Sequence, residues 1–257
     1  MLRIPPEATT LNTTKQQDIK FVEWSNDESE NSFDLRFLIA HIETSKARKP
    51  QLMDIGGGNG KCAEVTSRAL AESHVDVIDV SPLAREHFTR SPSCSLMFGD
   101  FLSLPFSKKY DFIIMRTVLH HMVGRTERES LDRQIATLQK AKGLLVPGGS
   151  IFITENFYVP LVGADTTGRL IFELTKLQTV ARVTRLLGAN TAGEGVRFRS
   201  KAAWDSMLSD VGLEQVDELT SDTWGQTMPL WQKVPLLCRG RFQRIVRCVV
   251  RSSAPPS

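Results

Sequence analysis

The amino-acid sequence predicts an α/β fold, a doubly wound and mostly parallel seven-stranded sheet with a helical cap. Short apolar runs recur along the 257 residues, and amphipathic helical patterns separate them. Strands that alternate with helices form crossover units, which place helices on both faces of a parallel sheet. Residues 156–198 interrupt this rhythm and are too many for an ordinary connection. We therefore expect a cap inserted after the fifth strand.

The predicted strands are short and apolar, as expected where helices bury both faces of a sheet. A glycine-rich turn follows the first strand, and the turn Pro147–Gly149 leads into the fifth. Helical patterns follow the first strand, precede the fifth, and cover 201–211 before the sixth. The seven strands are expected at 52–55, 75–78, 95–98, 112–115, 150–153, 213–219 and 242–250.

Two regions lie outside the regular alternation. The first precedes the opening strand and contains a predicted helix from Phe33 to Thr44. The second is the interruption after the fifth strand, where apolar positions at helical spacing indicate one or two amphipathic helices. The predicted division is an N-terminal helical segment or lid at 1–50, a ligand-binding core at 51–155, a helical cap insertion at 156–198, the rest of the sheet at 199–251 and a disordered tail at 252–257.

The composition is that of a globular protein, with 41% hydrophobic and 24% charged residues. It excludes a fibre and a disulfide-stapled mini-domain, and the apolar runs are too short for a membrane span. No secretory signal is visible at the N-terminus, and the four cysteines lack CxxC spacing, so we expect a cytoplasmic protein with reduced thiols. The net charge of +3 is too small to indicate nucleic acid as a partner.

A glycine-rich turn follows the first predicted strand. Glycines at Gly56, Gly57, Gly58 and Gly60 permit a tight turn and let a ligand lie against the backbone. In an open parallel sheet, ligands bind at the carboxyl ends of the strands. The spacing departs from the dinucleotide pattern GxGxxG, and Asp54 stands two residues before the first glycine. An acid there repels a pyrophosphate and favours a cationic or amino-acid-bearing ligand.

Acidic residues also follow the next two strands. Asp79 comes just past the second strand, where a carboxylate can accept hydrogen bonds from both hydroxyls of a ribose. Asp100 follows the third strand, where an acid can bind an adenine amino group, and Phe101 can line the base pocket. Each of these acids also has a purely structural interpretation, as a turn-forming or solvated residue.

Taken in order, these motifs resemble the class I S-adenosylmethionine-dependent methyltransferases, specifically the broad small-molecule group with an acid before GxGxG. The resemblance covers about residues 50–155 and also rests on Val118–His121 and Leu145–Gly149. It implies a Rossmann-like methyltransferase fold, with S-adenosyl-L-methionine (SAM) as cofactor and S-adenosyl-L-homocysteine as product.

The resemblance also implies a role for each cofactor residue. Asp54 and the backbone of 56–60 would hold the methionine moiety, and Asp79 would bind the ribose. Asp100 would bind the adenine amino group, with the backbone and ring of Phe101 beside it. The remaining cofactor-binding residues are Val80, together with Arg116 and Thr117, either of which would contact the cofactor through its backbone carbonyl.

Three further residues are candidates for catalysis. His120 and His121 follow the fourth strand, and a histidine there can deprotonate a hydroxyl or amine acceptor. Adjacent side chains point in different directions, so at most one is expected to face the pocket, and packing is the alternative for either. Glu155, after the fifth strand, is a substrate contact or a base, or else pairs with an arginine of the cap. Nothing in the spacing demands a metal site.

The expected reaction is in-line displacement of a methyl group from SAM onto an O, N or C atom of a small acceptor. Methyltransferases acting on exocyclic amines of bases commonly carry Asn/Asp-Pro-Pro-aromatic after the fourth strand, where this chain has Arg116–Leu119. We therefore expect an aromatic or natural-product-like metabolite of secondary metabolism as acceptor, and a monomer or homodimer.

Two other functions remain open. One is methylation of a protein or RNA, with the arginines of the last strand as a docking surface. Their structural interpretation is a solvated edge-strand face, and they are Arg239, Arg241, Arg244, Arg247 and Arg251. The other is a non-catalytic SAM-binding partner protein. The apolar loop Trp224–Trp231 is either core or a pocket wall, and it suggests a lipid or quinone acceptor as a special case.

Overall fold

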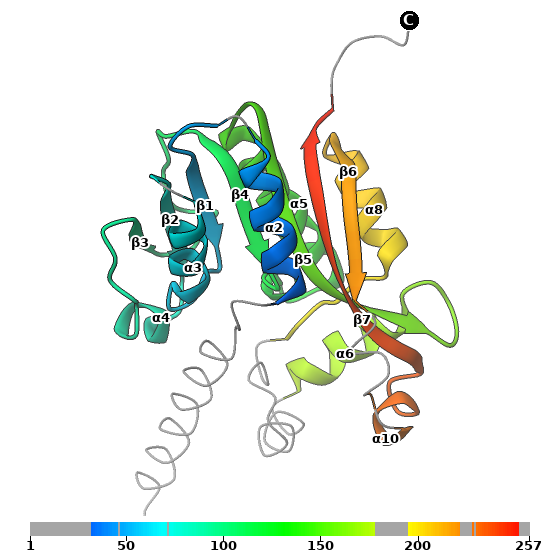
Figure 1. Cartoon of the computed structure of the whole chain (residues 1–257). Coiled ribbons are helices and arrows are strands. Elements are labelled where there is room, and N and C mark those ends of the chain that lie inside the picture. Colours follow the sequence, from blue (N-terminus) through cyan, green and yellow to red (C-terminus); the bar gives the residue numbers. More distant parts are fainter. Residues whose placement is uncertain are drawn as a thin grey trace, which may run out of the picture.

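The computed structural model describes residues 32–45, 47–70, 72–177, 195–221, 228 and 230–251. Its centre is a seven-stranded sheet in the order β3-β2-β1-β4-β5-β7-β6 (Figure 1). Strands β1 to β5 are parallel, and β7 runs antiparallel to both β5 and β6. The strands are β1 (Gln51–Ile55), β2 (His74–Asp79), β3 (Cys94–Phe98), β4 (Tyr110–Arg116), β5 (Leu145–Pro160), β6 (Leu213–Ser221) and β7 (Cys238–Val250). The predicted fold class is confirmed.

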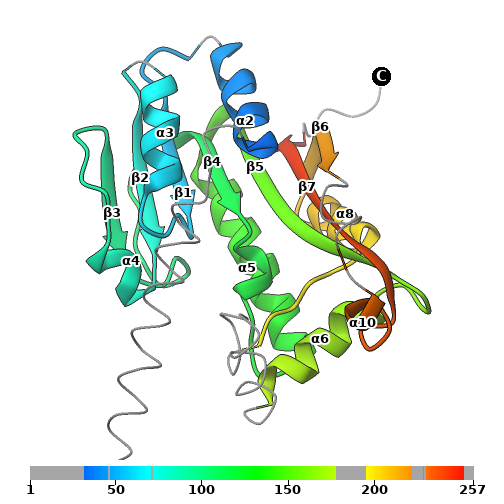
Figure 2. The same cartoon turned by 60° about the horizontal axis from the view of Figure 1, so that its bottom comes forward.

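Helices cover both faces of this sheet, as Figures 1 and 2 show. On one face α2 and α3 pack over Leu52, Val75 and Ile114, and on the other α5 and α8 pack over Met53, Ile113 and Ile151. Alternate residues of one strand thus enter opposite cores, as the pleat requires. The helices are α2 (Phe33–Glu43), α3 (Lys61–Ala69), α4 (Pro82–Glu86), η1 (Leu119–His121, a 3₁₀ turn), α5 (Glu127–Leu144), α6 (Thr166–Lys176), α8 (Lys201–Asp210) and α10 (Leu230–Lys233).

The strand order reverses between β1 and β4, which are neighbours although two strands separate them in sequence. Ligands bind at such a switch point, because the connections leave the sheet on opposite sides there and open a crevice at the carboxyl ends. The glycine turn after β1 and the segment after β4 both lie at this edge. The topology therefore brings the sequence motifs together.

The fifth strand is longer than predicted. The expected strand was 150–153, whereas β5 continues to Pro160 because it pairs with β7 from Ser150↔Val249 to Pro160↔Cys238. Residues 156–160 thus belong to the sheet, and the predicted start of the cap at 156 is wrong. Glu155 lies within the strand instead of at its end. The partner of these residues is far away in sequence, so no local pattern indicates the extension.

The last strand is not at the edge of the sheet. β7 lies between β5 and β6, and β6 forms the edge. The interpretation of its arginines as a solvated edge face is therefore wrong for Arg244 and Arg247, whereas Arg239 and Arg251 are exposed. Arg244 is buried and pairs with Asp205 and Glu218, and Arg247 pairs with Asp217. These acids come from α8 and β6, so Arg244 and Arg247 connect β7 to both of these elements.

The regions outside the core are described in part. The predicted helix at 33–44 is present as α2, and α6 provides one amphipathic helix within the predicted cap. The rest of that cap pattern, at 178–194, lies outside the described residues, as do 1–31, the tail 252–257 and most of the Trp224–Trp231 loop. Among the residues that the structure describes, no helix is long and apolar enough to cross a membrane.

Candidate active site

The glycine turn connects β1 to α3 with little space for side chains. Gly56, Gly58 and Gly60 all have positive φ, at 74°, 56° and 80°. A Cβ atom on Gly56 would collide with the side chain of Val118, which follows β4. Glycine at position 56 is thus needed both for its conformation and for the close approach of the two strand ends.

Asp54 lies beneath this turn. Its side chain is buried, and its Oδ2 would stand 2.6 Å from a Cβ on Gly57. Asp54 therefore packs directly against the turn on the face covered by α2 and α3. Its predicted contact with a methionine moiety stays a prediction.

Asp79 at the end of β2 is bound to the same turn. Its Oδ2 accepts a hydrogen bond from the Gly58 N–H at 2.9 Å, and its Oδ1 accepts one from the Ser81 N–H at 2.7 Å. Burial raises the pKa of this carboxyl, and the backbone donors offset only part of the effect. Further donors would stabilise the charged form, so the carboxylate is suited to bind hydroxyl groups. Val80 beside it is 64% exposed and offers an apolar surface.

Asp100 and Phe101 are placed differently from each other. Asp100 is partly exposed and accepts from the Leu102 N–H at 3.0 Å, while its other oxygen lies 3.3 Å from the Arg133 guanidinium. The Phe101 ring is 2% exposed and packs in the core against Phe106. The ring thus belongs to the core, and the predicted contacts of Phe101 with a base stay a prediction.

The segment after β4 is held from two sides. Arg116 forms a double hydrogen bond with the buried Asp34 of α2, with Nε 2.8 Å from Oδ2. This side chain is thus engaged by the N-terminal helix, which leaves its backbone for the predicted cofactor contact. Thr117 has a positive φ of 49° and donates to the Thr154 carbonyl at 2.7 Å. A β-branched residue rarely adopts this conformation, and strain of this kind concentrates at functional sites.

His120 and Glu155 form a buried pair. His120 Nδ1 lies 2.7 Å from Glu155 Oε2, while Glu155 Oε1 accepts hydrogen bonds from the N–H groups of Leu119 and His120. Among the residues that the structure describes, no arginine of the predicted cap pairs with Glu155, whose partner is His120. The carboxylate instead fixes η1 and orients the imidazole. Such a carboxylate favours the tautomer with the proton on Nδ1, which leaves Nε2 as an acceptor.

His121 points differently from its neighbour, as expected for adjacent residues. Its side chain is exposed, and its ring lies 4.2 Å from that of His120, centroid to centroid. The surrounding protein limits its hydration and lowers its pKa well below the usual range, and the charge of a protonated His120 lowers it further. The neutral ring is thus the form present at neutral pH.

Sequence reasoning missed the residues that hold this pair in place. The Phe198 ring stacks on His120 at 4.4 Å, and the Arg197 N–H donates to the His120 carbonyl at 2.8 Å. Gln134 of α5 is fully buried and donates to the carbonyls of Leu119 and Arg197. A glutamine in a helical pattern gives no local signal of this role. Only the packing of 195–200 against η1 reveals it.

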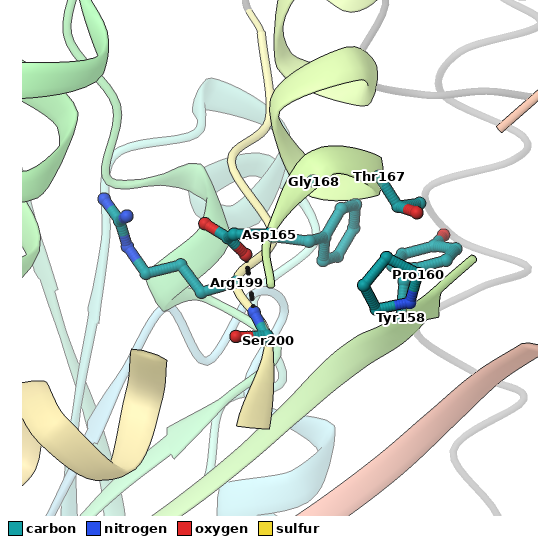
Figure 3. A pocket seen from close by; sticks show the side chains of 8 residues that line it. Tyr158, Pro160, Asp165, Thr167, Gly168, Arg199 and Ser200 are labelled. Atoms are coloured by element: carbon teal, nitrogen blue, oxygen red, sulfur yellow. Dashed lines mark hydrogen bonds between the residues drawn. The ribbon is translucent and has the colours of Figure 1, made fainter. Parts of the chain in front are cut away.

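A cluster of charged side chains includes Arg197 and Arg199, both buried, which flank Phe198 in the sequence. Arg197 is 0% exposed and pairs with both Glu127 of α5 and Asp165 before α6, and Arg199 also pairs with Glu127. Figure 3 shows a small pocket beside this cluster, where Asp165 accepts a hydrogen bond from the Ser200 N–H at 2.8 Å. The pocket has no room for a water molecule. The cluster is therefore a structural junction of α5, α6 and residues 195–200.

No group of three or more His, Cys, Asp and Glu side chains could hold a metal within the described ranges. His120 and Glu155 do converge, but as a hydrogen-bonded pair in which both carboxylate oxygens already have donors. The chemistry that this arrangement supports is binding at the glycine turn and proton transfer at the histidines.

Comparison with known proteins agrees with this fold. Residues 53–151 match a family described as a methyltransferase domain. No curated protein sequence matches the chain significantly. The N-methyltransferase NodS from Bradyrhizobium japonicum, solved with S-adenosylhomocysteine, is 15% identical, with a TM-score of 0.56 over 92% of this chain and 97% of that one.

A second solved structure shares the fold. It is the 1,6-didemethyltoxoflavin-N1-methyltransferase of Burkholderia thailandensis, with bound 1,6-didemethyltoxoflavin and S-adenosylhomocysteine. It is 14% identical, with a TM-score of 0.57 over 98% of this chain and 92% of that one. Residues 53–151 are thus similar to a methyltransferase domain, and the chain shares its overall fold with these two solved methyltransferases.

Proposed function

We propose that the chain transfers a methyl group from SAM to an O, N or C atom of a small, aromatic or natural-product-like metabolite. The single observation that carries this proposal is the hydrogen bond between Asp79 Oδ2 and the Gly58 N–H. It joins the acid after β2 to the turn after β1, so that a nucleoside and an amino-acid moiety can be held at one edge of the sheet. The cytoplasm and secondary metabolism remain the expected setting.

The residues at this edge fit SAM better than a dinucleotide. Asp54 and Asp79 lie on either side of the glycine turn, which favours a cationic, amino-acid-bearing ligand over a pyrophosphate. Exposed Val80 offers an apolar surface for a base, and Asp100 is partly accessible for its amino group. Substituents on the glycines would occupy the turn or displace Val118. When bound, SAM supplies an activated methyl group on a sulfonium that is already a good leaving group.

The protein then has two tasks, which are orientation and proton removal. In-line transfer requires the acceptor atom, methyl carbon and sulfur to be collinear, with water excluded. We assign the acceptor to the side of the site formed by η1, where His121 is exposed and His120 is oriented by Glu155. His120 Nε2 is the proposed base for a hydroxyl or amine acceptor. An acceptor that carries no acidic proton would need only the orientation.

Methylation of a macromolecule receives less support. The arginines proposed as its docking surface are partly consumed by the fold, because Arg244 and Arg247 form ion pairs with Asp205, Glu218 and Asp217. A neutralised arginine contributes little to the attraction of RNA or an acidic peptide. The small-molecule acceptor therefore remains our proposal.

The decisive experiment is calorimetric titration of SAM and S-adenosylhomocysteine into the wild type and Asp79→Ala. We expect the variant to bind each ligand at least about tenfold more weakly, on the order of 1.4 kcal/mol. Because Asp79 also holds Gly58 and Ser81, circular dichroism must show that the variant is folded. Asp132→Ala, at an exposed carboxylate of α5, is the matched control. A folded wild type that binds neither ligand would refute the proposal.

A further inference from the structure

An apolar patch lies at one end of the molecule, away from the glycine turn. Each member exposes a large apolar side chain. The members lie in the β5–α6 connection, in α10 and in the α10–β7 connection. They are Leu161 (49% exposed), Val162 (68%), Leu230 (77%), Val234 (66%) and Leu237 (42%). Solvent-facing apolar side chains are ordinary when they are scattered, but a contiguous group indicates an interaction surface.

The backbone brings these residues together. Val234 N–H donates to the Leu230 carbonyl at 3.0 Å, which places these two side chains one helical turn apart. Leu237 N–H donates to the Val234 carbonyl at 3.1 Å, and Leu237 ends the turn with a positive φ of 49°. The Leu161 N–H donates to the Leu237 carbonyl at 2.8 Å, which places the end of β5 beside them. Figure 1 shows α10 at the end of the long β5–β7 arm. The patch thus forms a single surface on a firm two-stranded support.

The two segments that carry the patch have charges of one sign, and the acid nearest to the patch in the sequence, Asp165, is paired with Arg197. Residues 156–164 and 228–241 contain no Asp or Glu, whereas the second segment carries Lys233, Arg239 and Arg241. Arg239 is exposed and Lys233 half-exposed, next to Leu237 and Val234 respectively. Exposed leucine and valine flanked by cations is the combination that binds an anionic membrane surface, because the apolar groups enter the acyl boundary while the cations meet the headgroups.

We propose that this patch binds the surface of a bilayer containing anionic phospholipid. A second copy of the chain is a poorer occupant, since a symmetric contact would place Lys233 and Arg239 of both copies at one interface without a carboxylate from either segment. An anionic headgroup layer complements both the charge and the apolar character. Binding at this end leaves the glycine turn untouched, so it can be measured without methyl transfer.

The test is co-sedimentation of the full chain with vesicles of phosphatidylcholine alone and of phosphatidylcholine mixed with phosphatidylserine. We expect binding to the mixed vesicles, weakened by salt, and little binding to phosphatidylcholine alone. The double variant Leu230→Ser/Val234→Ser, and separately Lys233→Glu/Arg239→Glu, should each lower the partition coefficient by about tenfold or more. Leu219→Ser, an exposed leucine on β6, and Lys49→Glu, an exposed cation before β1, should bind as the wild type does.

Three outcomes would overturn the proposal. The first is absence of binding to the mixed vesicles by folded wild type, and the second is equal binding by the patch variants and the controls. The third is a concentration-dependent dimer in sedimentation equilibrium that Leu230→Ser/Val234→Ser dissociates, which would assign the patch to a second copy. None of these depends on SAM binding, so failure here is distinguishable from failure of the proposed function.

Discussion

The two sides of the candidate site are built in different ways. On the cofactor side, short segments at the ends of β1 and β2 present backbone N–H groups and a carboxylate with one hydrogen bond to each oxygen, as at Asp79. On the histidine side, charged and polar groups are buried and satisfy one another, from the His120–Glu155 pair to Arg197 with Glu127 and Asp165. On the cofactor side, polar groups can still form hydrogen bonds with a ligand. On the histidine side, the polar groups bond to one another and hold η1, α5 and α6 together.

This difference predicts unequal responses to substitution. Substitutions in the buried network should lower the free energy of unfolding or kcat, because removing one partner leaves the other group buried and without compensation. Changes in the cofactor turn should act through backbone conformation and affect the fold less. The experiments below test that contrast.

The largest expected effect is at Arg197. Arg197→Met keeps much of the side-chain volume but removes the charge between Glu127 and Asp165, and we expect a loss of about 3–5 kcal/mol in the free energy of unfolding. Urea denaturation measures it. Arg128→Met, whose ion pair with Asp132 is exposed, should change stability by less than about 1 kcal/mol. If the two variants lose equal stability, the ion pairs of Arg197 stabilise the fold no more than the exposed pair does.

Glu155→Gln should impair chemistry more than binding. The amide no longer stabilises the Nδ1–H tautomer of His120, so we expect kcat to fall about 100-fold for an acceptor that must lose a proton. SAM affinity should be unchanged, because Glu155 does not contact the glycine turn. Nitrogen-15 NMR of the imidazole reports the tautomer independently of any acceptor. Glu173→Gln, at an exposed residue of α6, is the control. An unchanged His120 tautomer in Glu155→Gln would contradict this role.

The contact between the N-terminal helix and the site can be tested through pH. Burial alone would raise the pKa of Asp34, but Arg116 outweighs it and lowers the pKa below 3.8. A carboxyl whose pKa is lower in the folded state contributes stability above its unfolded pKa and loses it as the pH falls toward the folded value. Asp34→Asn should therefore cost about 2 kcal/mol at neutral pH, and its deficit against the wild type should shrink below pH 3.8.

Thermal unfolding over a pH series, with Asp132→Asn as the exposed control, measures this deficit. A deficit that is constant with pH would show that the Asp34–Arg116 charge pair does not stabilise the contact.

The smallest effect is expected at the glycine turn. Gly56→Ala places a Cβ against Val118 at a φ of 74°, and the conformation alone costs about 1 kcal/mol. Adding Val118→Ala should remove the closest approach, to Cγ2, but neither the 2.8 Å approach to the Cβ of residue 118 nor the backbone cost. A double-mutant cycle of unfolding free energies separates the approach that is removed from the costs that remain. If the losses in unfolding free energy of the two single variants simply add in the double variant, residues 56 and 118 are not in the close contact described.

Much of the fold followed from local patterns. Apolar runs such as Phe112–Met115 form strands that helices bury on both faces. For β1 to β4, each end of the strand lies within about two residues of its predicted position. The turn at Gly56–Gly60 and the acid at Asp79 were likewise visible, since glycine spacing and strand-end acids are local features. The burial of the Phe101 ring in the core was not visible in the sequence, because it depends on which way the side chain faces.

The tertiary structure decided what depends on distant partners. β5 reaches Pro160 only because β7 pairs with it, and β7 is internal only because β6 adds outside it. Glu155 pairs with His120, 35 residues earlier in the chain, and Arg197 pairs with Glu127, 70 residues earlier. Local sequence determines which residues are buried and where the chain turns, because both follow from hydropathy and backbone sterics. The choice of partner for a buried charge depends on which segments the whole fold brings within hydrogen-bond distance.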